Sequence, residues 1–206
     1  MYPPKHYQTN SEDKTEQAKL IGLVTNNPLA TLIINREREL PHVSHTPFHF
    51  DDNQTSLVGH TSNQHPLAKR LKQNQVEDII LIFHGEQGYI SPNYSEGQPV
   101  PTWNYSKVQI IGKAKIITDS NEKYKQMDIT TQYFEKEQTE PWLLDSAPSK
   151  AIEQMLKAIT IFKVSIDEIN GQFKLSQNKS TAVKQQISNQ LKLKGNQKLA
   201  EQMLIK

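Results

Sequence analysis

The stretch KVQIIGKAKIIT, residues 107–118, carries the clearest strand pattern in the chain. Val108, Ile110 and Gly112 alternate with polar positions, and two isoleucines extend the pattern. An alternation with a period of two places every second side chain on one face, as a half-buried strand requires. The pattern therefore predicts a β-strand over 107–118.

Shorter apolar or alternating segments predict further strands. They are expected at 29–35, 39–50, 56–60, 78–85, 88–91, 161–167 and 172–175. Pro41 and Pro47 place the segment 39–50 at a sheet edge or a bulge, because proline cannot donate to the hydrogen-bond ladder. Asn170-Gly171 is a typical hairpin turn and is expected to separate the last two strands.

Helical patterns lie between and after these strands. They are expected at 13–25, 66–72, 120–137 and 149–159, and over the tail 180–206 with an interruption at Gly195-Asn196. Ser176 or Asn178 is expected to cap the last helix, since both residue types favour that position.

Seven or eight short strands with interspersed helices predict an α+β fold that is mainly β, with an antiparallel sheet. Six or more such strands favour a closed or nearly closed barrel, because closure hides the sheet edges. We expect residues 1–180 to form the barrel domain, including its N-terminal helix. Residues 181–206 are expected to form a helical tail packed on the same domain.

Composition excludes several kinds of site. The 206 residues include no cysteine, which excludes disulfides, thiolate nucleophiles, zinc fingers and cysteine-ligated iron–sulfur clusters. Lys and Arg number 24 against 22 Asp and Glu, and this balance excludes binding to nucleic acid by charge alone.

The apolar segments are too short for a membrane span. The longest purely apolar run, 79–83, is much shorter than the roughly 20 residues that a membrane-spanning helix needs. The opening MYPPKHYQTN lacks the apolar core of a signal peptide. These features predict a cytoplasmic protein without membrane contact.

The segment 89–105, YISPNYSEGQPVPTWNY, is unusually rich in aromatic residues and proline. It is expected to form a loop that brings Tyr89, Tyr94, Trp103 and Tyr105 together. Loops that keep large aromatic side chains pack against a planar ligand or a partner chain, or are filled by their own rings. Both interpretations stay open on the residues alone.

The segment 59–66, GHTSNQHP, ends one predicted strand and begins a predicted helix. Thr61, Ser62 and Asn63 can donate hydrogen bonds to an anion, as can the free amides of the helix start, and Lys69 or Arg70 can add charge. A phosphate site and an ordinary helix cap are both consistent with this pattern.

Two other groups of residues are given simpler interpretations. His42, His45 and His49 lie close together, but no metal-binding motif is present, so we expect no metal site and place His45 toward a ligand. The basic tail 184–206 can contact DNA, although its apolar stripe favours packing on the domain.

Seven sequence blocks follow one another in a characteristic order. They are MYPPKHY at 1–7, PLATLI at 28–33, SHTPF at 44–48, LVGH at 57–60, FHGEQGYISPNY at 83–94, VPTWNY at 100–105 and KLSQN at 174–178. Together they resemble the PaiB family of FMN-binding negative transcriptional regulators over nearly the whole chain. The resemblance implies an FMN-binding split barrel, with six antiparallel strands and flanking helices, that forms a homodimer and binds FMN at the dimer interface.

The resemblance also implies which residues contact the cofactor. The FMN-contacting set is His45, Thr46, His60, Thr61, Ser62, Asn63, Lys69, Arg70, Trp103 and Tyr105, with Lys69 or Arg70 at the phosphate and Trp103 or Tyr105 over the flavin ring. This chain departs from the family pattern at Asn63, where the family usually has an arginine.

Three functions follow from the resemblance. The leading hypothesis is an FMN-binding regulator that represses transcription, with DNA or a regulatory protein as a further partner. A flavin-dependent oxidoreductase acting on a small molecule is the second, with its catalytic residues unassigned. A cofactor-free repressor with a vestigial flavin site is the third.

Overall fold

The computed structural model describes residues 8–9, 13–35, 39–74, 76–96 and 99–205, so the opening MYPPKHY block lies outside it. The strands are β1 (Gln8–Thr9), β2 (Leu29–Ile34), β3 (His42–Phe50), β4 (Ser56–Ser62), β5 (Val76–Ile90), β6 (Thr102–Ile116) and β7 (Ile159–Lys174). The α-helices are α1 (Lys14–Asn26), α2 (Pro66–Asn74), α3 (Ser120–Glu135), α4 (Ser149–Ala158), α5 (Thr181–Leu193) and α6 (Gln197–Gln202). Two short 3₁₀ turns are η2 (Pro92–Tyr94) and η3 (Leu144–Ser146).

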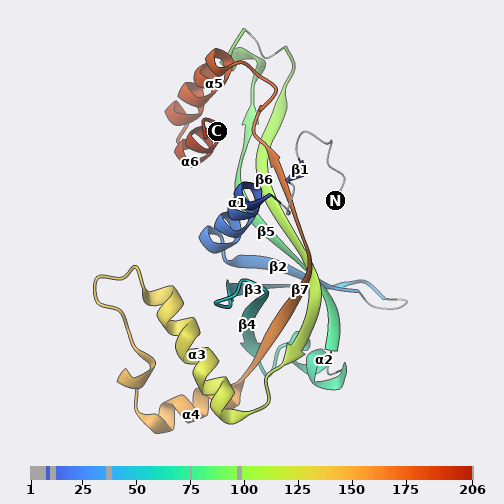
Figure 1. Cartoon of the computed structure of the whole chain (residues 1–206), viewed down its shortest axis with the longest axis vertical. Helices are drawn as coiled ribbons and strands as arrows, with labels where there is room; N and C mark the ends of the chain where they lie inside the picture. The colour runs from blue at the N-terminus through green and yellow to red at the C-terminus, as the bar shows by residue number, and fades with distance from the viewer. Residues whose placement is uncertain (1–7, 10–12, 36–38, 75, 97–98, 206) are drawn as a thin grey trace. The chain divides into compact units, whose positions relative to one another are not determined.

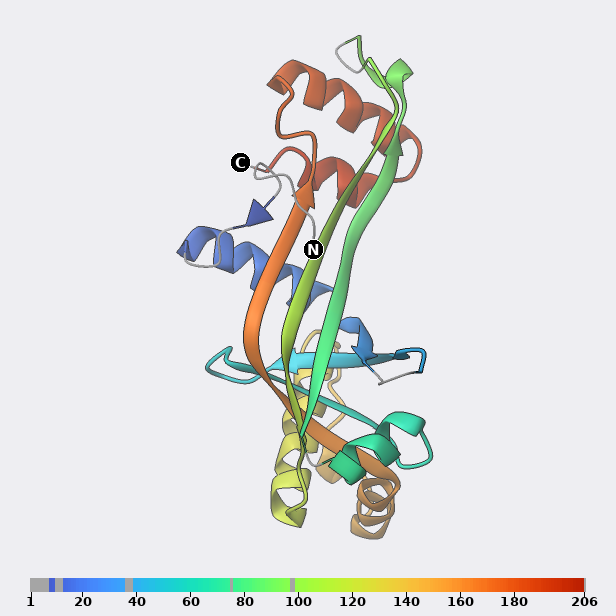
Figure 2. The ribbon, with the colours of Figure 1, turned by 90° about the vertical axis from the view of Figure 1, so that its right-hand side faces the viewer.

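The chain divides into two compact units. The barrel unit comprises residues 28–82 and 110–168, and the terminal unit comprises residues 1–27, 83–109 and 169–206. The three long strands β5, β6 and β7 each contribute residues to both units (Figures 1 and 2).

The barrel unit is a closed six-stranded antiparallel barrel with flanking helices, as the sequence predicted. The strand order is β7-β4-β3-β2-β5-β6, and a further pairing of β6 with β7 closes the ring. The antiparallel register pairs Thr31 with His45 and Ser56 with Ser165. In its interior the rings of Phe48 and Phe162 meet edge to face, with centroids 5.8 Å apart.

Two glycines allow the strands of this barrel to approach one another. A Cβ atom on Gly112 of β6 would overlap the carbonyl oxygen of Ser165 on β7. One on Gly59 of β4 would lie 2.6 Å from the ring of Phe48. Closure between β6 and β7 therefore requires a residue without a side chain at position 112.

The long strand β5 replaces two shorter strands that the sequence predicted at 78–85 and 88–91. Gly85 and Gly88, which bound the gap between the two predicted strands, lie within it. A Cβ on Gly85 would overlap the hydroxyl of Ser106, and one on Gly88 would lie 2.7 Å from a methyl group of Leu199. These glycines therefore serve close packing rather than a turn.

The predicted hairpin at Asn170-Gly171 was wrong, because β7 runs without interruption from Ile159 to Lys174. Gly171 and Gln172 instead pair with Thr9 and Gln8 of β1. Backbone pairing with another strand thus holds the dipeptide in an extended conformation.

The strand β3 was predicted at an edge or a bulge, but it lies between β2 and β4 in the barrel. Pro47 is tolerated because it stands where β3 changes partner. Residues 42–47 pair with β2, and pairing with β4 begins at Phe48. Pro41 precedes the strand.

The C-terminal helices pack within the terminal unit. The apolar residues of α5 and α6 form a buried cluster with Ile90 and Leu175: Ile187, Leu191, Leu199, Ala200 and Met203. This confirms the interpretation of the tail's apolar stripe as a packing surface. Gly195, with φ of 82°, separates the two helices, and Ser180 rather than Ser176 or Asn178 caps α5.

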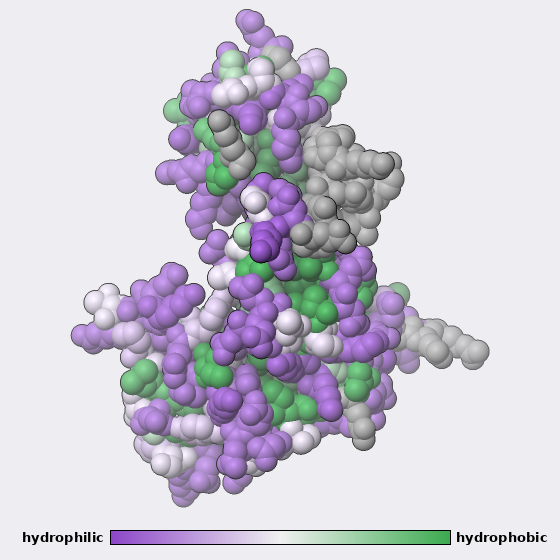
Figure 3. All heavy atoms as spheres, in the orientation of Figure 1, coloured by the Kyte–Doolittle hydropathy of each residue, from purple (hydrophilic) through white to green (hydrophobic). Residues whose placement is uncertain are grey.

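No helix in the described part of the chain is long and apolar enough to cross a membrane. Hydrophilic residues cover most of the molecular face drawn in Figure 3.

We expect Gly112→Ala to destabilise the protein by about 3 kcal/mol or more, since the new methyl group meets backbone that a side-chain rotation cannot move. Urea unfolding gives the free energy. Gly22→Ala is the control, because a Cβ on Gly22 of α1 has no neighbouring atom within 4 Å. Equal stability of the two variants would show that β6 and β7 do not approach as described.

Candidate functional site

The segment between β4 and α2 keeps the strand-to-helix geometry that the sequence predicted. The strand β4 ends at Ser62, and Pro66 begins α2. The amide of Leu67 donates to His65 Nδ1 over 3.1 Å, and the amide of Gln64 donates to Ser62 Oγ over 3.2 Å. The hydroxyl proton of Ser62 remains able to donate to a ligand.

Asn63 forms the centre of a hydrogen-bond network at this point. Its side-chain nitrogen donates to the carbonyl oxygen of Lys157 over 2.5 Å. Its Oδ1 accepts from the hydroxyl of Thr160 at 2.6 Å and from the ammonium group of Lys72 at 2.8 Å. The Asn63 amide therefore ties β4 to α4, β7 and α2, and it brings one cation to the end of β4.

The two predicted phosphate contacts on α2 differ in their surroundings. Arg70 Nε lies 2.9 Å from Glu77 Oε1, and Arg70 Nη2 donates to the carbonyl oxygen of Asn35 over 3.2 Å. Because Glu77 is buried, this ion pair commits Arg70 to holding α2 against the barrel. Lys69 is exposed, and its ammonium group makes no hydrogen bond with another described residue.

His45 and Thr46 lie on opposite faces of β3. The side chain of Thr46 is 3% exposed and points to the same face as Ser44 and Phe48, whereas His45 is exposed. On β4, His60 and Thr61 are half-buried. Of these four residues, His45 is therefore the most accessible to a ligand.

His49 of β3 packs against α3. Its Nε2 is 2.9 Å from the hydroxyl oxygen of Thr130, its Nδ1 is 3.0 Å from the carbonyl oxygen of Phe50, and its ring stacks on Tyr133. Burial holds the pKa of His49 below its usual value. Burial also lowers the pKa of His60, as does repulsion from His49 when that ring is protonated. Both imidazoles therefore take up a proton less readily in the fold than in the unfolded chain.

Trp103 and Tyr105 belong to the terminal unit, whereas the other eight predicted contacts belong to the barrel unit. They lie on β6 and Tyr89 lies on β5, so three of the four aromatic residues of the predicted loop lie on strands, whereas Tyr94 lies in η2 between the two strands. Trp103 is 55% exposed, and its ring meets that of Tyr89 edge to face with centroids 6.0 Å apart. Between Trp103 and Lys107 on β6, the buried side chains are Asn104 and Ser106.

An ammonium group lies on the same strand as Trp103. Lys107 Nζ is 2.8 Å from His84 Nδ1 and donates to Gln87 Oε1 over 3.1 Å. Partial burial lowers the pKa of Lys107. The strands β5 and β6 thus present polar and aromatic side chains together.

Sequence reasoning missed two residues of the Asn63 network. Lys72 follows Lys69 by three positions in α2, and this helical spacing could have placed the two ammonium groups on neighbouring parts of one face. Thr160 carried no signal, because 97 residues separate it from its partner.

A protein-family model described as "Putative FMN-binding domain" matches residues 1–168. The chain belongs to this FMN-binding domain family. It is 31% identical over 183 residues to protease synthase and sporulation protein PAI 2 of Bacillus subtilis, covering 87% of this chain and 84% of the relative. A match of this extent agrees with the resemblance to the PaiB family.

Solved structures share the fold at low sequence identity. An FAD- and heme-binding protein of Mycobacterium smegmatis is 19% identical, with a TM-score of 0.60 over 82% of this chain and 73% of that one. The flavocytochrome Anf3 of Azotobacter vinelandii is 18% identical, with a TM-score of 0.55 over 78% of this chain and 71% of that one.

The donor set between β4 and α2 suits the phosphate of a flavin nucleotide. It offers the hydroxyl group of Ser62 and the ammonium groups of Lys69 and Lys72, which are hydrogen-bond donors of the kind that phosphate oxygens accept. Thr61 precedes Ser62 in β4, so its side chain points to the opposite face of the strand. Within the described residues, no group of three histidine, aspartate or glutamate side chains gathers to hold a metal ion.

We expect the stability of the protein to fall as the pH drops below about 6.5, the usual histidine pKa. Because the pKa values of His49 and His60 are lowered in the fold, the unfolded chain binds protons that the native state rejects. Their contribution is fully present above pH 6.5 and is lost toward the folded pKa, by up to about 1.4 kcal/mol per pH unit for each histidine.

Urea unfolding between pH 5 and pH 8 measures this effect. The double variant His49→Gln, His60→Gln is expected to show a flatter profile, and His45→Gln, on the exposed face of β3, serves as the control. A profile equally steep in the double variant would assign the pH dependence to other groups.

Proposed function

We propose that the protein is an FMN-binding negative transcriptional regulator of the PaiB type. It acts as a homodimer that holds FMN at the subunit interface. The observation that carries this proposal is the set of phosphate donors between β4 and α2, which lies within the residues that the family model matches. The similarity to the Bacillus subtilis sporulation protein supports the regulatory role.

Lys72 takes the place of the arginine that the family usually has at position 63. Asn63 cannot supply a positive charge, but its Oδ1 holds the Lys72 ammonium group at 2.8 Å. The cation is thereby delivered from the adjacent helix to the end of β4. Arg70, which the sequence favoured equally with Lys69, is occupied by Glu77 and is not required for this role.

The remaining contacts with FMN are assigned to side chains that are accessible in the structure. Ser62 donates to a phosphate oxygen, Lys69 adds a second positive charge, and His45 contacts the ring system from the exposed face of β3. Trp103 belongs to the terminal unit, and its predicted place over the flavin ring is a separate part of the proposal. The bound flavin supplies hydride or electron transfer, and regulation follows from the difference between cofactor-loaded and empty dimers.

The visible absorption spectrum of the purified protein, before and after addition of FMN and removal of the excess, tests the proposal directly. A retained flavin band is expected. Sedimentation analysis of the same sample is expected to give a dimer. A colourless protein that takes up no FMN would overturn the proposal.

Comparison of FMN with riboflavin isolates the role of Lys72. Because a hydrogen bond to a charged group contributes about 1.5–3 kcal/mol, Lys72→Met is expected to weaken FMN binding about 10- to 100-fold. Riboflavin binding is expected to stay unchanged, since riboflavin carries no phosphate. Lys125→Met, an exposed lysine of α3, is the control. An equal loss for both ligands would remove Lys72 from the phosphate site.

Trp103→Ala is expected to weaken FMN binding at least about tenfold while it changes the free energy of unfolding by less than about 1 kcal/mol, because Trp103 is largely exposed. Quenching of flavin fluorescence measures the affinity. Trp142→Ala is the matched control, since Trp142 is 45% exposed and lies in the barrel unit. Unchanged affinity in Trp103→Ala would exclude the tryptophan as a cover for the ring.

Two assays separate this function from the alternatives. Steady consumption of NADH or NADPH by the loaded protein would favour a flavin-dependent oxidoreductase. Promoter binding in a mobility assay that is the same with and without FMN would favour a cofactor-free repressor. The proposed regulator is expected to bind DNA or a regulatory partner differently in its loaded and empty states.

A further inference from the structure

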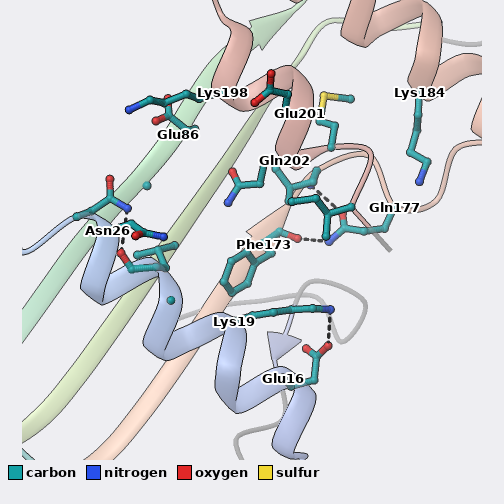
Figure 4. A pocket seen from close by; sticks show the side chains of 17 residues that line it. Glu16, Lys19, Asn26, Glu86, Phe173, Gln177, Lys184, Lys198, Glu201 and Gln202 are labelled. Atoms are coloured by element: carbon teal, nitrogen blue, oxygen red, sulfur yellow. Dashed lines mark hydrogen bonds and ion pairs between the residues drawn. The ribbon is translucent and has the colours of Figure 1, made fainter. Parts of the chain in front are cut away.

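The terminal unit contains a cavity of about 840 Å³ that is separate from the phosphate donors of the barrel unit. Residues of α1, β5, the end of β7 and the two C-terminal helices line it (Figure 4). Its volume falls within the range of cavities that take drug-sized ligands, about 300–1,000 Å³.

Part of the cavity wall is apolar. Leu23, Leu175 and Met203 are buried residues that line it. Phe173 is half-buried, and its ring lies between Gln202 and Lys19 in the close view (Figure 4). An apolar side chain of a ligand would find matching contacts here.

Gly22 of α1 forms part of the cavity wall. It lies in the middle of α1, where glycine is less favourable than alanine. A Cβ atom on Gly22 would have no neighbour within 4 Å, so packing inside the protein does not require a glycine. Gly22 lines the cavity, and the absence of a side chain lets a ligand approach the helix backbone.

The charged groups around the cavity are balanced in sign. Lys19 pairs with Glu16 at 2.8 Å. The other charged groups are two lysines and two glutamates: Lys184, Lys198, Glu86 and Glu201. Glu201 accepts from the Gln197 side chain, whereas no ion pair within the described residues joins the other three.

We infer that this cavity binds a short apolar peptide with free amino and carboxyl ends. A ligand of one sign would be repelled by half of the unpaired charges, whereas a zwitterion is attracted by both kinds. The amide groups of Asn26 and Gln202 line the cavity and can bond to peptide groups. The volume exceeds what a single amino acid fills, and the apolar wall accommodates its side chains.

Within this assignment, Lys184 binds the peptide carboxylate and Glu86 binds the amino group. These residues come from α5 and β5, so the two ends of the peptide are held by different elements. Recognition of both ends selects for length, because a longer peptide cannot place both charges at once.

Titration calorimetry with the tripeptide Leu-Leu-Leu tests the proposal on the full-length protein. We expect saturable binding, weakened at least tenfold for the same peptide with an acetylated amino end and an amidated carboxyl end. No heat up to millimolar peptide would overturn the proposal. Tighter binding of decanoate than of the peptide would also overturn it and assign the cavity to fatty acids.

The variant Gly22→Leu adds a side chain at a cavity-lining position where an added Cβ atom has no neighbour within 4 Å. We expect it to abolish tripeptide binding while its urea midpoint is unchanged or higher and its FMN uptake is retained. This pattern distinguishes the peptide site from the flavin site, because each can fail without the other. Tripeptide binding that survives in Gly22→Leu would show that the peptide binds elsewhere.

Lys184→Met tests the carboxylate contact. We expect tripeptide affinity to fall about five- to fiftyfold, and the amidated peptide to bind the variant and the parent protein equally. Lys192→Met is the matched control, because Lys192 is an exposed lysine of the same helix that does not line the cavity. Equal effects of the two substitutions would exclude a specific role for Lys184.

Discussion

The candidate phosphate site depends on the approach of β6 to β7 at Gly112. Without a side chain at this position, the Ser165 carbonyl group fits against β6, and the barrel closes. The strand β7 then continues the ladder to β4, with Ser56 opposite Ser165 and Ser62 opposite Ile159. The end of β4 is therefore fixed by the strand whose position Gly112 permits.

The side chain of Asn63 connects the end of β4 to three neighbouring elements by hydrogen bonds. It bonds to Lys157 and Thr160, at the junction of α4 with β7, and to Lys72 in α2. An arginine here would bring its own charge, whereas the amide has donor and acceptor atoms that connect three elements. The polar segment is thus held by hydrogen bonds to three elements, and its positive charge comes from a neighbouring helix. Fixing donors before a ligand arrives lowers the entropic cost of binding.

Most helices and strands could be predicted from the sequence. The prediction failed at glycines, which can serve either a turn or a close contact between strands. The alternating pattern of 107–118 identified β6, and the number of strands indicated a barrel. A gap was predicted between Gly85 and Gly88 and a turn at Gly171, yet all three glycines lie within continuous strands. Whether a glycine serves a turn or a close contact depends on a neighbour that is distant in sequence, and local patterns carry no information about that neighbour.

The choice among the cations of α2 shows the same limit. Spacing along the chain placed Lys69 and Arg70 equally near the predicted anion, but burial of Glu77 decides between them. A buried carboxylate needs a partner with several donors, and the forked guanidinium of Arg70 meets this need better than an ammonium group. The lysines of the helix are left for the proposed phosphate contact. The electrostatic requirement of a buried residue in β5 therefore determines which charge the barrel presents at the end of β4.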